Sequence, residues 1–96
     1  MPAYVFYQAE VVDPVRYEEY KTSAAASVAA AGGRYIVRGG DVEVLEGDGP
    51  EGRTVVVDFP TRQAALDWYR GDAYARARQL RESAARANLY LIDGVG

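Results

Sequence analysis

Proton transfer in this sequence must rest on carboxylates, tyrosines and basic side chains, because the 96 residues contain no histidine and no cysteine. Their absence excludes thiol nucleophiles, disulfides, zinc sites built on cysteine or histidine, and any serine–histidine–aspartate triad. The acids between residues 41 and 51 also lack the spacing of a calcium-binding loop. We therefore expect neither a metal nor a cofactor.

Asp58 is the acid best placed for general-base chemistry. It follows the apolar run 55–57, shares a strand face with Val56, and could point into a partly apolar pocket. An unpaired carboxylate in such surroundings can act as a base near neutral pH. Arg38 or Arg81 would then stabilise the enolate formed by proton abstraction. The alternative is that Asp58 makes a structural salt bridge to Arg38 or Arg81, and the sequence leaves both interpretations open.

Aromatic side chains are frequent, with eight tyrosines among the 96 residues. Such side chains combine a large apolar body with a polar tip, which suits a pocket for a planar or aromatic ligand. The candidate ligand-binding residues are Tyr17, Tyr20, Tyr35, Trp68, Tyr69 and Tyr74. The same residues at helical spacing are also typical of a protein core and of a dimer interface.

Charge is unevenly distributed along the chain, although the net charge is only −3 and the pI about 4.8. Residues 41–58 carry six acids against Arg53 alone, and residues 70–88 carry five arginines against two acids. This pattern indicates either complementary surfaces, within the chain or between copies, or ordinary solvated faces. The acidic balance argues against nucleic acid or an anionic membrane as a partner.

No segment of the sequence resembles a targeting signal or a membrane span. The amino terminus lacks a basic region, and Gln8 and Glu10 interrupt its apolar stretch. A membrane span needs roughly 18 apolar residues, which no segment approaches. We therefore expect a cytoplasmic location.

The first half of the chain predicts a strand, a helix and a second strand. Residues 3–12 are rich in β-branched and aromatic residues, which indicates a strand. Asp13-Pro14 predicts the start of a helix, and Gly32-Gly33 predicts its end after Ala31. Residues 34–38 form the next predicted strand, and a kink at Gly39-Gly40 would let the same strand resume over 42–45.

The second half adds a strand, a broken helix and a last strand. Arg53 to Phe59 is predicted to pair with the second strand as an antiparallel hairpin. Thr61 would cap the following helix, which Gly71-Asp72 interrupts. Residues 89–92 form the short last strand.

This β-α-β-β-α-β order predicts a ferredoxin-like α+β fold in a single domain over residues 1–96, with a four-stranded antiparallel sheet and helices on one face. The other sheet face would carry apolar side chains of the first strand, such as Tyr4 and Phe6. Leaving them exposed would create a large apolar patch. We therefore expect a two-fold homodimer whose second strand embraces the partner.

Several motifs resemble one bacterial family. They are the opening Met1-Pro2-Ala3-Tyr4, the helix start Asp13-Pro14-x-x-Tyr17-x-x-Tyr20, the run from Gly32-Gly33-Arg34-Tyr35 to Arg38-Gly39-Gly40, Phe59-Pro60, and Trp68-Tyr69. The chain is similar over nearly its whole length to the domain-of-unknown-function family number thirteen-thirty, within the dimeric α/β-barrel superfamily. The resemblance implies a homodimer whose sheets face each other, forming a dimeric α/β barrel. The sequence departs from the family pattern at two positions, with Asp58 where glutamate is common and Gly71 where serine is usual.

Two functional hypotheses follow. The superfamily includes cofactor-independent monooxygenases, isomerases and cyclases, so the resemblance implies a small cofactor-free enzyme acting on an aromatic or enolisable metabolite. The alternative is a non-catalytic module that binds a small molecule or a protein through the same fold.

Overall fold

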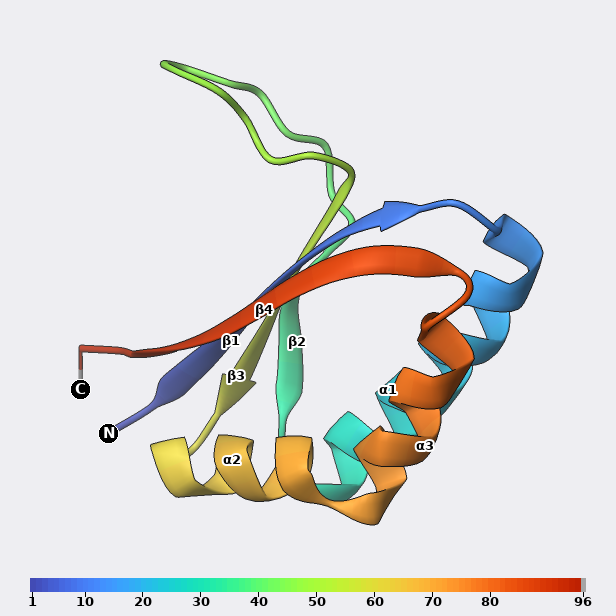
Figure 1. Cartoon of the computed structure of the whole chain (residues 1–96). Helices are drawn as coiled ribbons and strands as arrows, with labels where there is room; N and C mark the ends of the chain where they lie inside the picture. The colour runs from blue at the N-terminus through green and yellow to red at the C-terminus, as the bar shows by residue number, and fades with distance from the viewer. Residues whose placement is uncertain (96) are drawn as a thin grey trace.

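One of the two inner strands of the sheet is β1 (Ala3–Val11), which pairs on both sides with antiparallel neighbours. The computed structural model describes residues 1–95, and its sheet has the strand order β2-β3-β1-β4. The remaining elements are α1 (Pro14–Ala30), β2 (Arg34–Arg38), β3 (Arg53–Phe59), α2 (Arg62–Arg70), α3 (Asp72–Arg81) and β4 (Ala85–Asp93). The predicted ferredoxin-like α+β fold is confirmed, with an open sheet in the single chain and the second helix divided into α2 and α3 at Gly71 (Figure 1).

The helix ends agree with the capping signals in the sequence. The Asp13 side chain accepts a hydrogen bond from the backbone N–H of Arg16, and Pro14 occupies the first turn of α1. The Thr61 hydroxyl caps α2 by accepting from the N–H of Ala64. These caps satisfy backbone donors that would otherwise lack partners.

Successive side chains of β1 point to opposite sides, so the sheet has two different faces. Val5, Tyr7 and Ala9 are buried beneath the helices, where they pack with alternate residues of β3 and with α1 and α3 in one core. Tyr4 and Phe6 lie on the other face, which we call the open face. There Phe6 stacks on Tyr90 with ring centroids 5.8 Å apart.

The prediction that the second strand resumes over 42–45 is wrong. Residues 40–52 form an exposed arm that projects from the sheet (Figure 1). The opposing side of this arm contains three glycines and Pro50, which has no N–H to donate to a ladder. Gly39, at φ 71°, marks the point where pairing with β3 stops.

The last strand is longer than the sequence indicates. It begins at Ala85, because residues 85–88 pair with β1 opposite Val11 to Gln8. Ala, Arg and Asn are weak strand formers, so tertiary pairing overrides their propensity here. No helix within residues 1–95 has the length and apolar character needed to cross a membrane.

We expect Gly52→Ala to destabilise the fold. Gly52 has φ 76°, and a Cβ there would collide with the backbone carbonyl of Ala9. A left-handed backbone costs other residues roughly 1–2 kcal/mol, and the collision adds to it, so the loss should reach about 2 kcal/mol or more. Urea unfolding at one fixed protein concentration measures it.

The matched control is Gly40→Ala, because a Cβ at Gly40 has no heavy atom within 4 Å and no positive φ to accommodate. Its free energy of unfolding should change by less than about 0.5 kcal/mol. Equal effects of the two substitutions would contradict the role assigned to Gly52.

Candidate functional site

Tyrosine side chains fill the space between α1 and the sheet. Tyr7 from β1 donates to or accepts from Tyr17 of α1, with the two hydroxyl oxygens 2.9 Å apart. Tyr20 of α1 pairs in the same way with Tyr74 of α3, also at 2.9 Å. All four side chains are buried. We call these four residues the tyrosine cluster.

Arg81 completes the cluster from α3. Its guanidinium donates to the Tyr74 hydroxyl at 3.2 Å and lies 5.8 Å from the ring centroids of Tyr7 and Tyr20. No carboxylate among residues 1–95 forms an ion pair with it. A half-buried cation therefore rests on aromatic rings and one phenol rather than on an opposite charge.

The cluster holds more hydrogen-bond donors than acceptors. Each tyrosine pair has two hydroxyl protons, and the bond within the pair uses one of them. Arg81 has five N–H groups, and one of them donates to the Tyr74 hydroxyl. No carboxylate within residues 1–95 pairs with the remaining donors. This arrangement suits a group that accepts hydrogen bonds and carries negative charge.

Burial raises the pKa of Tyr20 far above its ordinary value, and the neighbouring hydroxyls of Tyr74 and Tyr7 raise it further. Burial is also the main cause of the raised pKa values of Tyr7, Tyr17 and Tyr74. The positive charge of Arg81 opposes these shifts without cancelling them. The phenols are therefore neutral donors near neutral pH, not bases.

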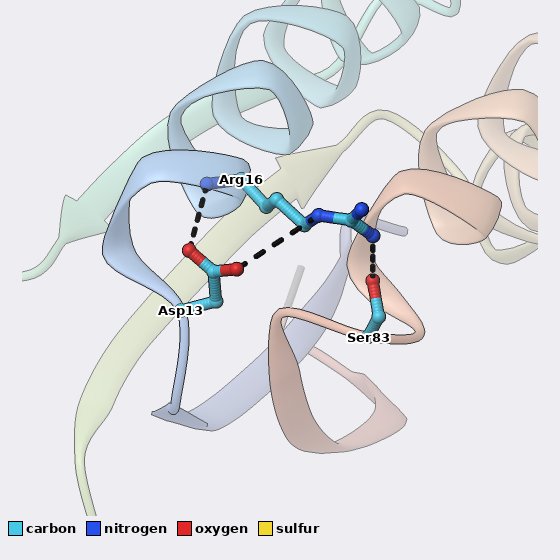
Figure 2. A network of polar contacts seen from close by, with 3 residues as sticks. All are labelled: Asp13, Arg16 and Ser83. Atoms are coloured by element: carbon cyan, nitrogen blue, oxygen red, sulfur yellow. Dashed lines mark hydrogen bonds and ion pairs between the residues drawn. The ribbon is translucent and has the colours of Figure 1, made fainter.

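A small polar network holds α1 against the turn after α3. Figure 2 shows Arg16 between Asp13 and Ser83, and its Nη1 donates to the Ser83 hydroxyl at 2.7 Å. The N–H groups of Val12 and Asp13 both donate to the carbonyl of Ala84. These contacts fix the start of α1 relative to α3 and so set the distance between the tyrosines of the two helices.

Two cavities adjoin the cluster. One, of about 30 Å³, lies between α1 and the sheet, and Tyr7, Tyr17, Tyr20 and Tyr35 are among its walls. The other, of about 230 Å³, lies between α2 and the β1–β4 side of the sheet and is mostly apolar. Both share the walls Val5, Trp68 and Leu89.

Trp68 separates the two cavities and is held in place by the end of α1. Its indole Nε1 donates to the Ser27 hydroxyl at 3.0 Å, and that hydroxyl donates to the carbonyl of Ala24 at 2.7 Å. The ring also packs on Tyr74, with centroids 4.3 Å apart. Trp68 is thus a fixed wall between the tyrosine cluster and the apolar pocket.

Of the aromatic residues predicted to bind a ligand, the structure brings four to the small cavity: Tyr17, Tyr20, Tyr35 and Trp68. Tyr69, partly exposed, lines the apolar pocket with Trp68. Tyr74 lines neither of these two cavities; it is fully buried and acts through its bonds to Tyr20 and Arg81.

The three predicted catalytic residues do not meet. Asp58 lies on the open face, where it pairs with Arg34 at 3.1 Å. Arg38 and Arg81 lie on the helix-covered face. The predicted salt bridge to Arg38 or Arg81 is therefore wrong in its partner, because residues 34 and 58 stand opposite each other in the β2–β3 ladder.

Sequence reasoning missed Lys21 and Arg53, both of which line the small cavity. The sequence signal for Arg53 is the two-residue repeat of its strand. Every second residue from Arg53 onward lies on the buried strand face, and these residues are Val55, Val57 and Phe59. Lys21 follows Tyr17 by four positions and so lies on the same helix face. No group of three His, Cys, Asp or Glu side chains in the described part of the chain is arranged to hold a metal ion.

The sequence profile of the family named Domain of unknown function (DUF1330) matches residues 2–95. The chain belongs to this DUF1330 family. The resemblance stated from the motifs is confirmed, and it extends over nearly the whole chain. No curated protein sequence gives a significant match.

Solved structures similar to this DUF1330 chain share its fold at low sequence identity. Protein RPA0582 of unknown function from Rhodopseudomonas palustris is 16% identical, with a TM-score of 0.75 over 99% of this chain and 83% of that chain. SnoaB, a cofactor-independent oxygenase from Streptomyces nogalater, is 12% identical, with a TM-score of 0.68 over 99% and 94%. A hypothetical Arabidopsis thaliana protein is 14% identical, with a TM-score of 0.71 over 99% and 89%.

We expect the stability of this DUF1330 protein to fall as pH rises above about 10. The unfolded chain loses phenolic protons near that pH, whereas the raised pKa of Tyr20 keeps its proton in the folded state. The folded state then binds more protons, so the free energy of unfolding decreases by up to about 1.4 kcal/mol per pH unit for each such tyrosine.

Urea unfolding of Tyr20→Phe across this pH range tests the effect, because the variant should show a shallower decline. Val28→Ala is the control, since it removes core packing without removing a titrating group. It should lower stability equally at each pH. A decline that is unchanged in Tyr20→Phe would refute the assignment.

Proposed function

We propose that this protein binds a small phenolic or enolisable metabolite as its oxyanion, between the sheet and the α1–α3 pair, and acts on it as a cofactor-independent enzyme. The observation that carries the proposal is Arg81, a half-buried guanidinium in contact with three tyrosines and without an ion-pair partner in residues 1–95. An enolate or phenolate oxygen would supply the missing negative charge.

The site favours stabilisation of an oxyanion over abstraction of a proton. No aspartate or glutamate lines either of the two cavities beside the tyrosine cluster. The substrate class is therefore one that ionises readily by itself, such as a phenol or a stable enol. The fold shared with SnoaB, itself a cofactor-independent oxygenase, supports chemistry of this kind.

Space for a ring comes from the apolar pocket beside the small cavity. The small cavity, at about 30 Å³, has room for about one small polar group. The apolar pocket is large enough for a single ring and shares three walls with it.

Binding of para-nitrophenol tests the oxyanion site. The protein should stabilise its coloured phenolate, so that the bound probe ionises at a lower pH than the free probe. Arg81→Gln removes the charge and should weaken phenolate binding about tenfold or more, since hydrogen bonds to charged groups contribute roughly 1.5–3 kcal/mol.

Arg76→Gln is the matched control, because Arg76 lies on the same helix but is exposed and, within residues 1–95, makes none of the contacts with the tyrosine cluster that Arg81 makes. Equal binding by wild type and Arg81→Gln would overturn the proposed site. Oxygen uptake with naphthohydroquinone, corrected for autoxidation, then distinguishes an enzyme from the alternative, a module that binds the oxyanion without converting it.

We also propose that the protein is a homodimer formed through the open face. Tyr90 and Ile92 on that face are each 47% exposed. Tyr90 begins an apolar row across the four strands, which continues through Phe6, Val56 and Val37. The rim carries opposite charges, Glu10 opposite Arg86 and Asp58 paired with Arg34. A second copy of this sheet would cover the apolar centre and leave the charged rim in solvent. Two such sheets would enclose the predicted dimeric α/β barrel.

Light scattering at micromolar concentration should give about twice the 10.5 kDa chain mass. Tyr90→Glu places charge in the apolar row of the open face and should yield monomers at the same concentration, whereas Arg76→Gln should leave the mass unchanged. A folded wild-type monomer would contradict the dimer.

A further inference from the structure

Three cationic side chains line the small cavity: Lys21, Arg38 and Arg53. No aspartate or glutamate is among its walls. Lys21 is already paired with Glu18 at 2.8 Å, but within residues 1–95 neither arginine forms an ion pair. A chain with 14 acids and 11 bases thus leaves two arginines uncompensated at one cavity.

Local geometry presents both guanidinium groups for binding. The Arg38 guanidinium lies over the Tyr35 ring, with Cζ 4.5 Å from the ring centroid, and none of its N–H groups makes an ion pair within residues 1–95. Arg53 lies across Gly39, where a Cβ would collide with its guanidinium. Gly39 therefore gives Arg53 the room to reach the cavity.

The two arginines are electrostatically connected to the tyrosine cluster. Burial raises the pKa of Tyr17, and the charges of both Arg53 and Arg81 act against that rise. Burial likewise raises the pKa of Tyr35, and Arg38 and Arg53 oppose it. The charges of Arg53 and Arg81 thus both act on the Tyr17 hydroxyl.

We infer that the ligand carries a carboxylate that binds Arg38 and Arg53, in addition to the oxyanion at Arg81; this deepens the proposed function and rests on it. A carboxylate offers two oxygens that match the guanidinium fork, and it approaches the size of the small cavity. The substrate class is accordingly a phenolic or enolic carboxylic acid. Arg38 and Arg53 select it, and the tyrosine cluster with Arg81 holds its reactive oxygen.

Para-hydroxybenzoate and para-hydroxybenzamide form a matched pair of probes, because they share the phenol and differ in the charge at the other end. Calorimetric titration of the wild-type protein should show the carboxylate binding about tenfold or more tightly than the amide. Arg38→Gln and Arg53→Gln should each reduce this preference, and the double variant should abolish it. Arg53→Lys, which keeps the charge but loses the fork, should retain part of it.

The controls separate this inference from the proposed function. Arg76→Gln should keep the full preference, and Arg81→Gln should weaken both probes equally while the preference remains. A preference that survives in the double arginine variant, or is lost in Arg76→Gln, overturns the carboxylate site even if Arg81→Gln weakens both probes. If Arg81→Gln has no effect while the preference depends on Arg38 and Arg53, the oxyanion site fails and the carboxylate site stands. Absence of binding by both probes refutes both.

Discussion

The layer of tyrosine rings between α1 and the sheet is the feature on which the rest of the structure depends. Phenyl rings of Tyr7, Tyr17 and Tyr20 fill a gap that aliphatic side chains of similar spacing would leave open. The same residues bring hydroxyl groups into the core, where each must find a partner. Pairing the hydroxyl groups with one another gives each oxygen a partner, but one hydroxyl proton in each pair is not used in the bond within that pair. A requirement of packing thereby produces a buried, donor-rich surface.

A single extra residue in β2 decides which charges face that surface. Tyr35 stands opposite Val57 and Val37 opposite Val56, so Ile36 is the extra residue of a β-bulge. Without it, Tyr35 and Arg38 would point to opposite faces of the sheet, because they differ by three positions. The bulge brings both onto the helix-covered face, where the arginine stacks on the ring. The β1–β3 pairing contains no bulge, so Asp58 stands opposite Tyr4 and lies with it on the open face.

Most of the fold could be predicted from the sequence because its signals are local. Asp13-Pro14, Thr61 and Gly71 mark helix boundaries through capping chemistry that does not depend on distant residues. The beginning of β4 could not be predicted, since only pairing with β1 makes Ala85 to Asn88 a strand. The candidate aromatic residues followed from residue type and helical spacing. The partner of Asp58 did not, because register across a sheet is a long-range property that the bulge also alters.

Burial gives the two arginines of the small cavity, Arg38 and Arg53, different roles in the proposed carboxylate site. The acids of the arm are exposed, and solvent screens exposed charges over a Debye length of about 8 Å at physiological salt. Arg38 is also exposed, so water weakens its attraction for a ligand and it acts mainly through the geometry of its fork. Arg53 is half-buried, between the sheet and Gly39, where the effective dielectric constant is lower and the same charge interacts more strongly. In the proposed carboxylate site, affinity would therefore come chiefly from Arg53, and Arg38 would orient the ligand.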